Sequence, residues 1–507
     1  MPETDTLRLH EADNVVIAMK RLPAGTAIDA DVITGAAIPA GHKIATRPVA
    51  AGAEIRKFGQ IIGYASQDIA PGDHVHVHNC VMGDHDRDYH FGTEVNPVAR
   101  AADGTRRSFD GFRRNDGRVG TRNYIAVCST VNCSATVSRY IADAFNRSDA
   151  LAPYPNIEGV VAFAHGTGCG MAGKGDGFDN LERTIWGHAT HPNVGAVLIV
   201  GLGCEVFQIS ALADKYDLTD TDRFHRMTIQ GTGGTRKTIE EAVARIKELL
   251  PAANAAEREP CPAAEISVAL QCGGSDGLSG ISANPALGRA TDLLVAQGGT
   301  GILAETPEIY GAEHLLARRA VSADVGEKLI ERIRWWEHYT SINGGEMDNN
   351  PTPGNKAGGL TTILEKSLGA VAKGGTSPLM GVYRYGEPVD VRGFVFMDSP
   401  GYDPASVTGQ VASGANVVCF TTGRGSAFGC KPAPSIKLAT NSRTYETMID
   451  DMDINCGDVA DGDATIETKG AEIFEEILAV ASGKTTKSEA LGLGDNEFVP
   501  WQVGAVM

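Results

Sequence analysis

Four short apolar runs in this chain each end in a turn that carries a cysteine. The runs are residues 124–127, 159–164, 195–200 and 266–270, and the cysteines that follow them are Cys133, Cys169, Cys204 and Cys272. A run of this kind followed by an amphipathic segment is typical of a buried strand leading into a helix. The carboxyl ends of parallel strands share one edge of a sheet, so the thiols can converge on one crevice. The repetition predicts an α/β fold with its chemistry at strand ends.

The stretch 271–288, QCGGSDGLSGISANPALG, is the most concentrated of these turns. A thiol, the carboxylate of Asp276 and small residues that let backbone amides approach a ligand lie within five positions. A single cysteine in such a turn is more often a small buried hydrophobic residue. Because the design recurs four times, we favour a shared metal or cluster site.

Chain length and local composition indicate three domains. A chain of 507 residues exceeds what one hydrophobic core usually serves. Residues 1–95 contain short runs separated by Gly and Pro turns, which predicts a small all-β domain. Residues 108–250 and 264–507 follow a βα pattern, and the Ala-, Pro- and Glu-rich stretch 251–264 is predicted to be a linker.

Three histidines alternate with valines in the segment 73–79, DHVHVHN. A period of two places His74, His76 and His78 on one face of a predicted strand. A solvated strand face is the simpler interpretation for His74. For His76 and His78, contact with a ligand or substrate is an equal alternative.

The composition excludes several classes of partner. The formal charge of −18, with no Lys/Arg block, argues against nucleic-acid or anionic-membrane binding. The longest apolar runs fall far short of the roughly 20 residues of a membrane span. Ten cysteines without a disulfide spacing or a CxxC pair, behind a polar N-terminal stretch, favour a reducing cytoplasm. The P-loop-like segment 168–175 lacks the Ser or Thr that would hold Mg²⁺, so NTPase activity is not expected.

Seven segments, in order and over nearly the whole chain, resemble the altronate/galactarate dehydratase family. They are GFRRNDGRVGTRN, HGTGCG, GLGCE, QCGGSDGLSGISANPALG, TPEIYGAEH, NPTPGNKAGGL and TTGRGS with the following PSIKLATN. The N-terminal stretch with HVHVHN is similar to that family's SAF (β-clip) domain. HVHVHN and TPEIYGAEHLL resemble the altronate branch more than the galactarate branch. A sulfolactate sulfo-lyase branch shares the fold but is usually split over two chains.

The resemblance implies a fold, an activity and a cofactor. The fold is α/β, with a small N-terminal β-clip (SAF) module followed by two Rossmann-like α/β domains with mostly parallel sheets. The activity is that of a hydro-lyase on a small anionic sugar acid, most closely D-altronate to 2-dehydro-3-deoxy-D-gluconate plus water, with galactarate as the alternative. The cofactor is iron, as Fe²⁺ or a labile iron–sulfur cluster, with Mn²⁺ as a substitute. A cytoplasmic homodimer is expected.

Dehydration requires neutralisation of the substrate carboxylate, a base for the C2 proton and an acid or metal for the leaving hydroxyl. We hypothesise that Cys133, Cys169, Cys204 and Cys272 hold most of the iron; a mononuclear Fe²⁺ held by fewer cysteines plus His76 or His78 is the rival. His165 is the first candidate for the base, followed by Asp276 and Glu305, and each is alternatively an orienting residue. The candidates for carboxylate binding are Lys356, Arg424 and Arg122.

A non-catalytic sugar-acid sensor on the same fold is the alternative from a different functional class. A sensor could dispense with the thiols, whereas this chain has the full set of polar loop residues. The sequence therefore favours the enzyme.

Overall fold

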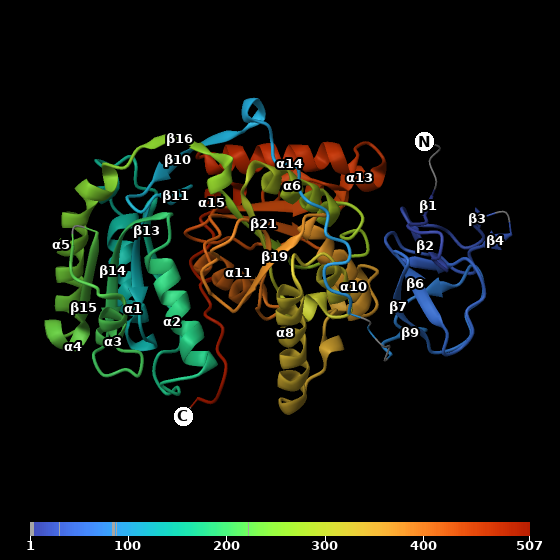
Figure 1. The fold of residues 1–507 in the computed structure, drawn as a ribbon, viewed down its shortest axis with the longest axis horizontal. Coiled ribbons are helices and arrows are strands. Elements are labelled where there is room, and N and C mark those ends of the chain that lie inside the picture. The colour runs from blue at the N-terminus through green and yellow to red at the C-terminus, as the bar shows by residue number, and fades with distance from the viewer. Residues whose placement is uncertain (1–4, 30, 84–86, 88, 222, 507) are drawn as a thin grey trace.

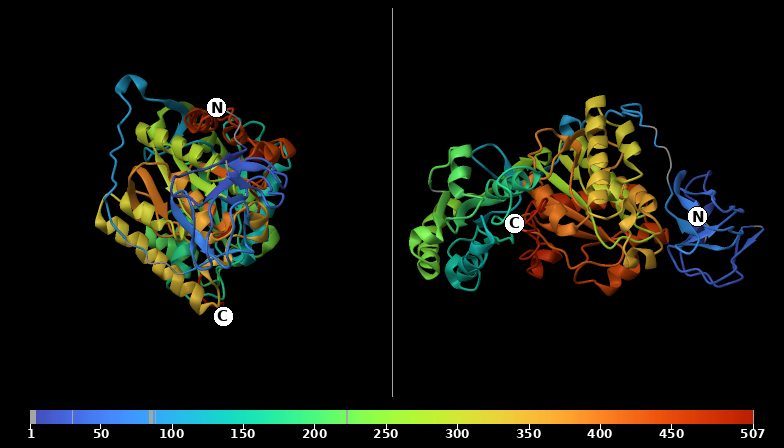
Figure 2. Two further views of the ribbon diagram at one scale, coloured as in Figure 1. Left: turned by 90° about the vertical axis from the view of Figure 1, so that its right-hand side faces the viewer. Right: turned by 90° about the horizontal axis from the view of Figure 1, so that it is seen from below.

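The computed structural model describes residues 5–29, 31–83, 87, 89–221 and 223–506. Three bodies lie in a row along the long axis of the molecule (Figure 1). The C-terminal domain is in the middle, with the N-terminal module at one end and the second domain at the other, and Figure 2 shows the same order from below. A small β module followed by two α/β domains with parallel sheets confirms the predicted fold class.

The N-terminal module consists of three small antiparallel sheets. One has the order β1-β2-β5-β8, formed by Thr6–Leu7, Val15–Ala18, Lys43–Ala45 and His74–Val75. Another has the order β6-β7-β9, formed by Glu54–Lys57, Gln60–Ala65 and Cys80–Val81. The third pairs β3 (Ala27–Asp29) with β4 (Val32–Ile33). Glycine turns with positive φ between these short strands, such as Gly72, allow the chain to reverse often.

The second domain is a four-stranded parallel sheet of order β13-β12-β14-β15. Its strands are Tyr124–Ser129 (β12), Gly159–Phe163 (β13), Val194–Gly201 (β14) and Phe224–Thr228 (β15). Its helices are Asn132–Asn146 (α1), Asp176–Ala189 (α2), Ile209–Tyr216 (α3), Ile229–Thr232 (α4) and Thr235–Asn254 (α5). The apolar runs form the strands because both faces of the sheet are buried.

The stretch predicted as a linker after this domain contains a strand. Residues 251–254 complete α5, and β16 (Arg258–Pro262) pairs antiparallel with β10 (Ser108–Arg113). With β11 (Val119–Gly120) they form a small sheet beside both α/β domains. The predicted linker thus contains a strand that composition alone does not reveal, because the ladder partner of β16 lies about 150 residues earlier.

The C-terminal domain has a seven-stranded parallel sheet of order β19-β20-β18-β17-β21-β22-β23. Its strands are Ser267–Cys272 (β17), Thr300–Leu303 (β18), Leu379–Tyr383 (β19), Gly393–Met397 (β20), Val417–Thr422 (β21), Ser435–Ala439 (β22) and Ile454–Asn455 (β23). Alternate residues of β17 enter different cores: Val268 and Leu270 pack on one face, and Ala269 on the other.

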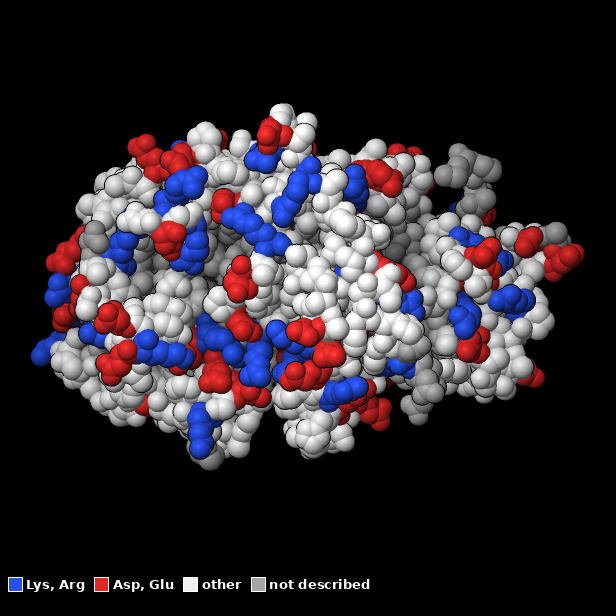
Figure 3. Space-filling view, viewed as in Figure 1, with Lys and Arg blue, Asp and Glu red and all other residues white. Residues whose placement is uncertain are grey.

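Helices cover both faces of this sheet. The longer ones are Ala283–Gln297 (α6), Ala323–Ile342 (α8), Ile363–Val371 (α10), Asp403–Ala412 (α11) and Ile466–Ala481 (α14). The shorter ones are Glu313–Arg318 (α7), Pro353–Ala357 (α9), Ser442–Thr447 (α12), Gly457–Asp461 (α13) and Lys487–Ala490 (α15). In the described residues, no helix combines the length and the apolar character that a membrane crossing requires. On the face shown in Figure 3, basic and acidic side chains are interspersed.

A C-terminal segment ties the second domain to the C-terminal domain. Phe498 packs its ring against Phe163 and His188 of the second domain, with centroids 5.2 and 4.7 Å apart. Three residues later, Trp501 stacks on Trp336 of α8 at 5.2 Å. The segment therefore contributes aromatic contacts to both domains.

A buried ion cluster fastens the N-terminal module to the C-terminal domain. Glu365 of α10 accepts from Lys43 of β5 at 2.8 Å and from Lys57 of β6 at 2.9 Å, and all three side chains are at most 2% exposed. The surrounding apolar cluster is continuous across the interface and includes Ile62 of the module and Leu368 of α10. Two ammonium groups and one carboxylate thus fix how the module docks.

We expect Glu365→Gln to loosen this interface. The change leaves two buried ammonium groups without their anion, which costs about 3–5 kcal/mol. Hydrogen–deuterium exchange in β5 and β6 should accelerate at least about a hundredfold, since 1.4 kcal/mol is a factor of ten. The matched control is Glu54→Gln, which breaks the partly exposed pair with Arg56 and should change exchange little. Equal exchange in the two variants would contradict this role of Glu365.

Acid should loosen the interface in the same way. The two ammonium groups hold the pKa of Glu365 far below its ordinary value of 4.5. When folding lowers the pKa of a carboxyl group, its contribution to the folded state is complete at any pH above the pKa that it has in the unfolded chain. The contribution is lost as the pH falls from there toward the lower pKa of the folded state. Exchange at the interface, corrected for its intrinsic pH dependence, should be constant from about pH 7 to pH 5 and rise below about pH 4.5.

Candidate functional site

The strand order of the C-terminal sheet reverses beside β17, which makes this position the topological switch point of the sheet. The chain passes from β17 to β18 and on to β19 and β20 on one side, and then crosses to β21 on the other. Ligands of open parallel sheets bind outside the carboxyl ends of strands at such a point. The two loops meet there, because the amides of Gly423 and Arg424 donate to the carbonyl of Gly274 at 3.1 and 2.9 Å. The loop of Asp276 therefore lies against the loop of Arg424.

The carboxyl group of Asp276 joins its own loop to the turn that follows β22. Its Oδ1 accepts from the hydroxyls of Ser279 and Thr440 at 2.9 Å, and its Oδ2 accepts from Asn441 at 3.0 Å. A Cβ on residue 423 would overlap this carboxyl group, so Gly423 permits the close approach. Burial raises the pKa of Asp276. With its oxygens engaged by neighbouring loops, Asp276 fits the orienting role better than that of a base.

Helix α9 connects this switch point with the N-terminal module. Asn355 donates to the carbonyl of Ser275 at 2.8 Å, and the carbonyl of the last residue of α9 accepts from Nε2 of His42 at 3.4 Å. Lys356 lies between these two contacts. Within the part of the chain that the structure describes, neither the Lys356 ammonium nor the exposed Arg424 guanidinium has an ion pair. Both cations are available to a bound carboxylate.

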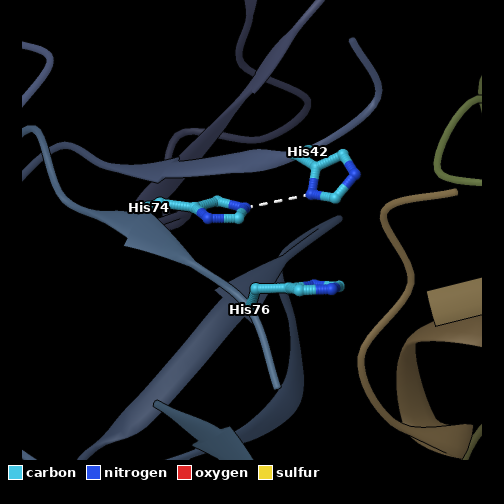
Figure 4. Close-up of side chains that lie close together, drawn as sticks. All are labelled: His42, His74 and His76. Atoms are coloured by element: carbon cyan, nitrogen blue, oxygen red, sulfur yellow. Dashed lines mark hydrogen bonds between the residues drawn. The ribbon is translucent and has the colours of Figure 1, made fainter. Parts of the chain in front are cut away.

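Three imidazoles gather where the module meets α9. His42, His74 and His76 each offer a ring nitrogen, and these atoms all lie within 4.8 Å of one another. Nδ1 of His42 and Nε2 of His74 are hydrogen-bonded at 3.0 Å, and the ring of His76 stacks on that of His74 at 5.3 Å. Figure 4 shows the three rings projecting toward the neighbouring segment of the C-terminal domain. Three imidazoles in such a group are a donor set for a divalent transition metal.

An unpartnered nitrogen supports this interpretation. Nδ1 of His76 is buried and has no hydrogen-bond partner among the described residues. Burial lowers the pKa of His76 to about 3 and that of His74 to about 4, and it also lowers the pKa of His42. The rings are therefore neutral at pH 7, as imidazole ligands must be. Such groups normally find a partner, and a bound cation would supply one here.

The predicted histidine strand takes a different form. Strand β8 ends at Val75, and the chain turns because Oδ1 of Asn79 accepts from the amide of His76 at 2.9 Å. His78 is exposed, with its ring 5.6 Å from that of His74. The expectation of three histidines on one strand face was wrong, because a turn over residues 76–79, in which the amide of Asn79 donates to the carbonyl of His76 at 2.9 Å, interrupts the period of two.

Sequence reasoning missed His42. The residue precedes β5, and antiparallel pairing of β5 with β8 brings it to His74 although 32 residues separate the two. The segment Gly41-His42-Lys43 has no spacing typical of a metal-binding motif. Only the strand register reveals the third imidazole.

Cys272 and Glu305 lie at the carboxyl ends of β17 and β18, inside the C-terminal domain. With Glu308 they form a group of acidic ligands within 4.8 Å, and all three are buried. Two ammonium groups neutralise this group: Lys373 is 2.9 Å from the Cys272 sulfur, and Lys366 is 2.7 Å from Glu308. These two cations offset the carboxylate charge inside the domain.

Glu305 is the unusual member of this cluster. It has a positive φ of 72°, and its Oε1 is buried without a partner among the described residues. Burial, together with the neighbouring charge of Glu308, raises its pKa well above 4.5. Burial also raises the pKa of the Cys272 thiol to about 12. Glu305 is thus set up to hold a proton beside the switch point.

The remaining thiols and His165 belong to the other sheet. Cys133, Cys169 and Cys204 are exposed beyond the ends of β12, β13 and β14, so the structure does not bring Cys272 together with them. Nε2 of His165 donates to the Ser129 carbonyl at 2.8 Å, and its Nδ1 accepts from an amide at 3.2 Å. Burial lowers the pKa of His165 to about 4. With both ring nitrogens engaged, His165 fits the orienting alternative.

The side chain of Arg122 lies in the contact between the second domain and the C-terminal domain. Its guanidinium is bidentate to Glu489 at 2.6 and 2.8 Å, and it also donates to the carbonyls of Thr121, Val480 and Lys484. These five hydrogen bonds use all five N–H groups of the side chain. The structure assigns Arg122 to domain packing rather than to substrate binding.

Comparison with known proteins gives matches in all three parts of the chain. Residues 4–83 match the altronate/galactarate dehydratase SAF domain, residues 111–254 the second domain of D-galactarate dehydratase/altronate hydrolase, and residues 263–506 the D-galactarate/altronate dehydratase C-terminal domain.

Curated relatives are similar over almost their whole length. Altronate dehydratases of Bacillus subtilis (strain 168) and Escherichia coli (strain K12) are each 36% identical over 95% of this chain and 96% of their own. The galactarate dehydratase (L-threo-forming) of Escherichia coli (strain K12) is 37% identical over 97% of this chain and 96% of its own. These matches confirm the resemblance seen in the sequence motifs. The chain belongs to the altronate/galactarate dehydratase family.

Proposed function

We propose that this protein is a hydro-lyase that removes water from a sugar acid, with D-altronate as the first substrate to test and galactarate as the second. The observation that carries the proposal is the three-imidazole group, with its unpartnered His76 nitrogen, beside Lys356 and the switch-point loop of Arg424. Similarity to two altronate dehydratases and a galactarate dehydratase over nearly the full chain supports it. The identities do not separate the two substrates.

The donor set fits iron. Imidazole suits Fe²⁺ among the first-row metals, and three protein ligands leave positions open for a substrate. His42, His74 and His76 would hold the ion, and Mn²⁺ is an alternative occupant. When bound, the metal would supply a Lewis acid for the substrate's carboxylate and hydroxyl oxygens.

The remaining steps belong to side chains of this chain. Arg424 and Lys356 bind the substrate carboxylate, which offsets the negative charge that builds up as the C2 proton leaves. His78, exposed beside the imidazole group, accepts that proton. Asp276 holds its loop against the turn after β22, where Asn441 also donates to the carbonyl of Gly423. Glu305 holds a proton behind the site.

The reaction itself is the first test. Protein purified without oxygen and loaded with Fe²⁺ should convert a C6 sugar acid to a 2-keto-3-deoxy acid, with D-altronate and galactarate compared directly. Sulfolactate, assayed by sulfite release, tests the sulfo-lyase branch. Binding of a sugar acid without any product would favour the sensor. The homodimer stays a prediction, which light scattering of the same sample tests.

The proposed roles of His76 and His78 can be distinguished by the metal content of their variants. His76→Ala should lose both the bound metal and turnover, because it removes a ligand from the three-imidazole group. His78→Ala should keep the metal and lose about 10²–10⁴ in kcat, as expected for a general base. Metal analysis after gel filtration and steady-state kinetics measure the two effects. Full metal content in His76→Ala would remove this residue from the site.

Binding of the substrate carboxylate by Arg424 can be distinguished from a general effect of positive charge on substrate binding. Arg424→Ala should raise KM about 10–100-fold, since a hydrogen bond to a charged group contributes about 1.5–3 kcal/mol. Arg443→Ala removes the same charge from an exposed position in α12 and should leave KM unchanged. An unchanged KM in Arg424→Ala would count against this role of Arg424.

A further inference from the structure

The contact between the second domain and the C-terminal domain contains a small polar pocket. The C-terminal segment lies there between α2 and α8 (Figure 1), and a Cβ on Gly177 of α2 would overlap the carbonyl of Val503. On the side of α8, the rings of Trp501 and Trp335 are 5.7 Å apart. The pocket has a volume of about 20 Å³, which is enough for one guest of about the size of a water molecule. Its charged and amide-bearing lining residues are Asp176, Asn180, Arg183, Arg332, Arg384 and Asp398.

Two N–H groups of α2 residues that line this pocket are buried and lack an acceptor. Nδ2 of Asn180 and Nε of Arg183 have no hydrogen-bond partner among the residues that the structure describes. Asn180 is only 3% exposed. The orientation of its amide is fixed, because Oδ1 accepts from the Arg183 guanidinium at 2.8 Å and the reverse orientation would bring two donors together. Both unpartnered groups are therefore donors, so the partner that they require is an acceptor.

The charges that line the pocket favour an anion over a water molecule. Within the described part of the chain, neither Arg183 nor the neighbouring Arg384 forms an ion pair. Asp398 is engaged elsewhere, since its Oδ1 accepts from Trp336 at 2.8 Å and its Oδ2 lies 4.0 Å from Arg332. The lining therefore contains three guanidinium groups and two carboxylates, and the cations are in excess.

The guanidinium of Arg183 in particular lacks sufficient negative charge around it. Burial lowers its pKa, and the carboxylates of Asp179 and Glu387 offset only part of this effect. The positive charge of Arg384 acts in the same direction as burial. A buried cation without an anion is costly, whereas an anion that accepts from its N–H group would offset both the charge and the unmade hydrogen bond.

We propose that Asn180 and Arg183 bind a chloride ion at the contact between the two α/β domains. The Nδ2–H of the amide and the Nε–H of the guanidinium donate to the ion, and the volume of the pocket excludes polyatomic anions such as sulfate or a sugar acid. The ion stabilises the contact, because both donors belong to α2 of the second domain whereas Arg332 and Arg384 line the pocket from the C-terminal domain. Neither donor belongs to the site proposed for the sugar acid, so the inference goes beyond the proposed function.

The dependence of hydrogen–deuterium exchange on chloride tests the site in the full-length protein. A ligand that binds only the closed contact slows exchange in proportion to its concentration once the site is filled. Exchange in α2 and in residues 498–503 should therefore slow by up to about tenfold for each tenfold rise in chloride, with gluconate keeping the ionic strength constant. Sulfate, which is too large for the pocket, should not replace chloride.

Asn180→Asp is the most informative variant. The new carboxylate has the shape of the amide, pairs with Arg183 and repels chloride, so exchange should no longer depend on chloride while the fold is kept. Arg183→Met removes the charged donor and should abolish the dependence as well. The matched control is Asn496→Asp, because Asn496 is exposed and also accepts from an arginine, Arg139, at 3.2 Å. This control should respond to chloride as the wild type does.

Diffraction from crystals grown in bromide locates the ion. An anomalous peak between Nδ2 of Asn180 and Nε of Arg183 would support the proposal. Absence of that peak would overturn it, as would wild-type exchange that does not depend on chloride, because a water molecule would then satisfy the two donors. An equal response to chloride in the wild type and Asn180→Asp would also overturn it. Turnover is not part of any of these measurements, so a failure of the proposed function would leave their results unchanged.

Discussion

The structure depends on one buried ion cluster. Glu365, between Lys43 and Lys57, joins the N-terminal module to the C-terminal domain. The same carboxylate accepts from the amide and hydroxyl of Thr361, so it also fixes the chain that leads from α9 into α10. Buried charges of this kind need their partners in place, so they favour one docking arrangement over others. The three-imidazole group lies against α9 only while that arrangement is kept.

The candidate site is therefore assembled from parts that cannot form it alone. The module supplies imidazoles, and the C-terminal domain supplies two cations without an ion pair among the described residues, Lys356 in α9 and Arg424 on the loop after β21. Asp276 and Asn355 are the links, because each bonds to a neighbouring loop rather than to its own strand. The second domain has its own set of strand-end loops and thiols. The proposed site thus lies at one sheet edge of the C-terminal domain and at its interface with the N-terminal module.

Much of the fold could be predicted from the sequence because its strands are apolar runs buried on both faces, as in residues 266–270. The strand-end loops followed from that pattern. Strand β16 (residues 258–262) could not be predicted, because its pairing partner is distant. His42 was missed for the same reason. Arg122 looked like a substrate cation because four of its five acceptors lie more than 350 residues away in the sequence, and local reasoning does not reach them.

The C-terminal aromatic segment has a consequence for biosynthesis. Phe498 and Trp501 follow both α/β domains in the chain, yet each contributes to a contact with one of them. During translation, both domains leave the ribosome before this segment does. The two domains can therefore fold separately first, and their final alignment waits until the segment emerges. A nascent chain halted before residue 498 would contain the strands of both parallel sheets but would lack the aromatic contacts of Phe498 and Trp501.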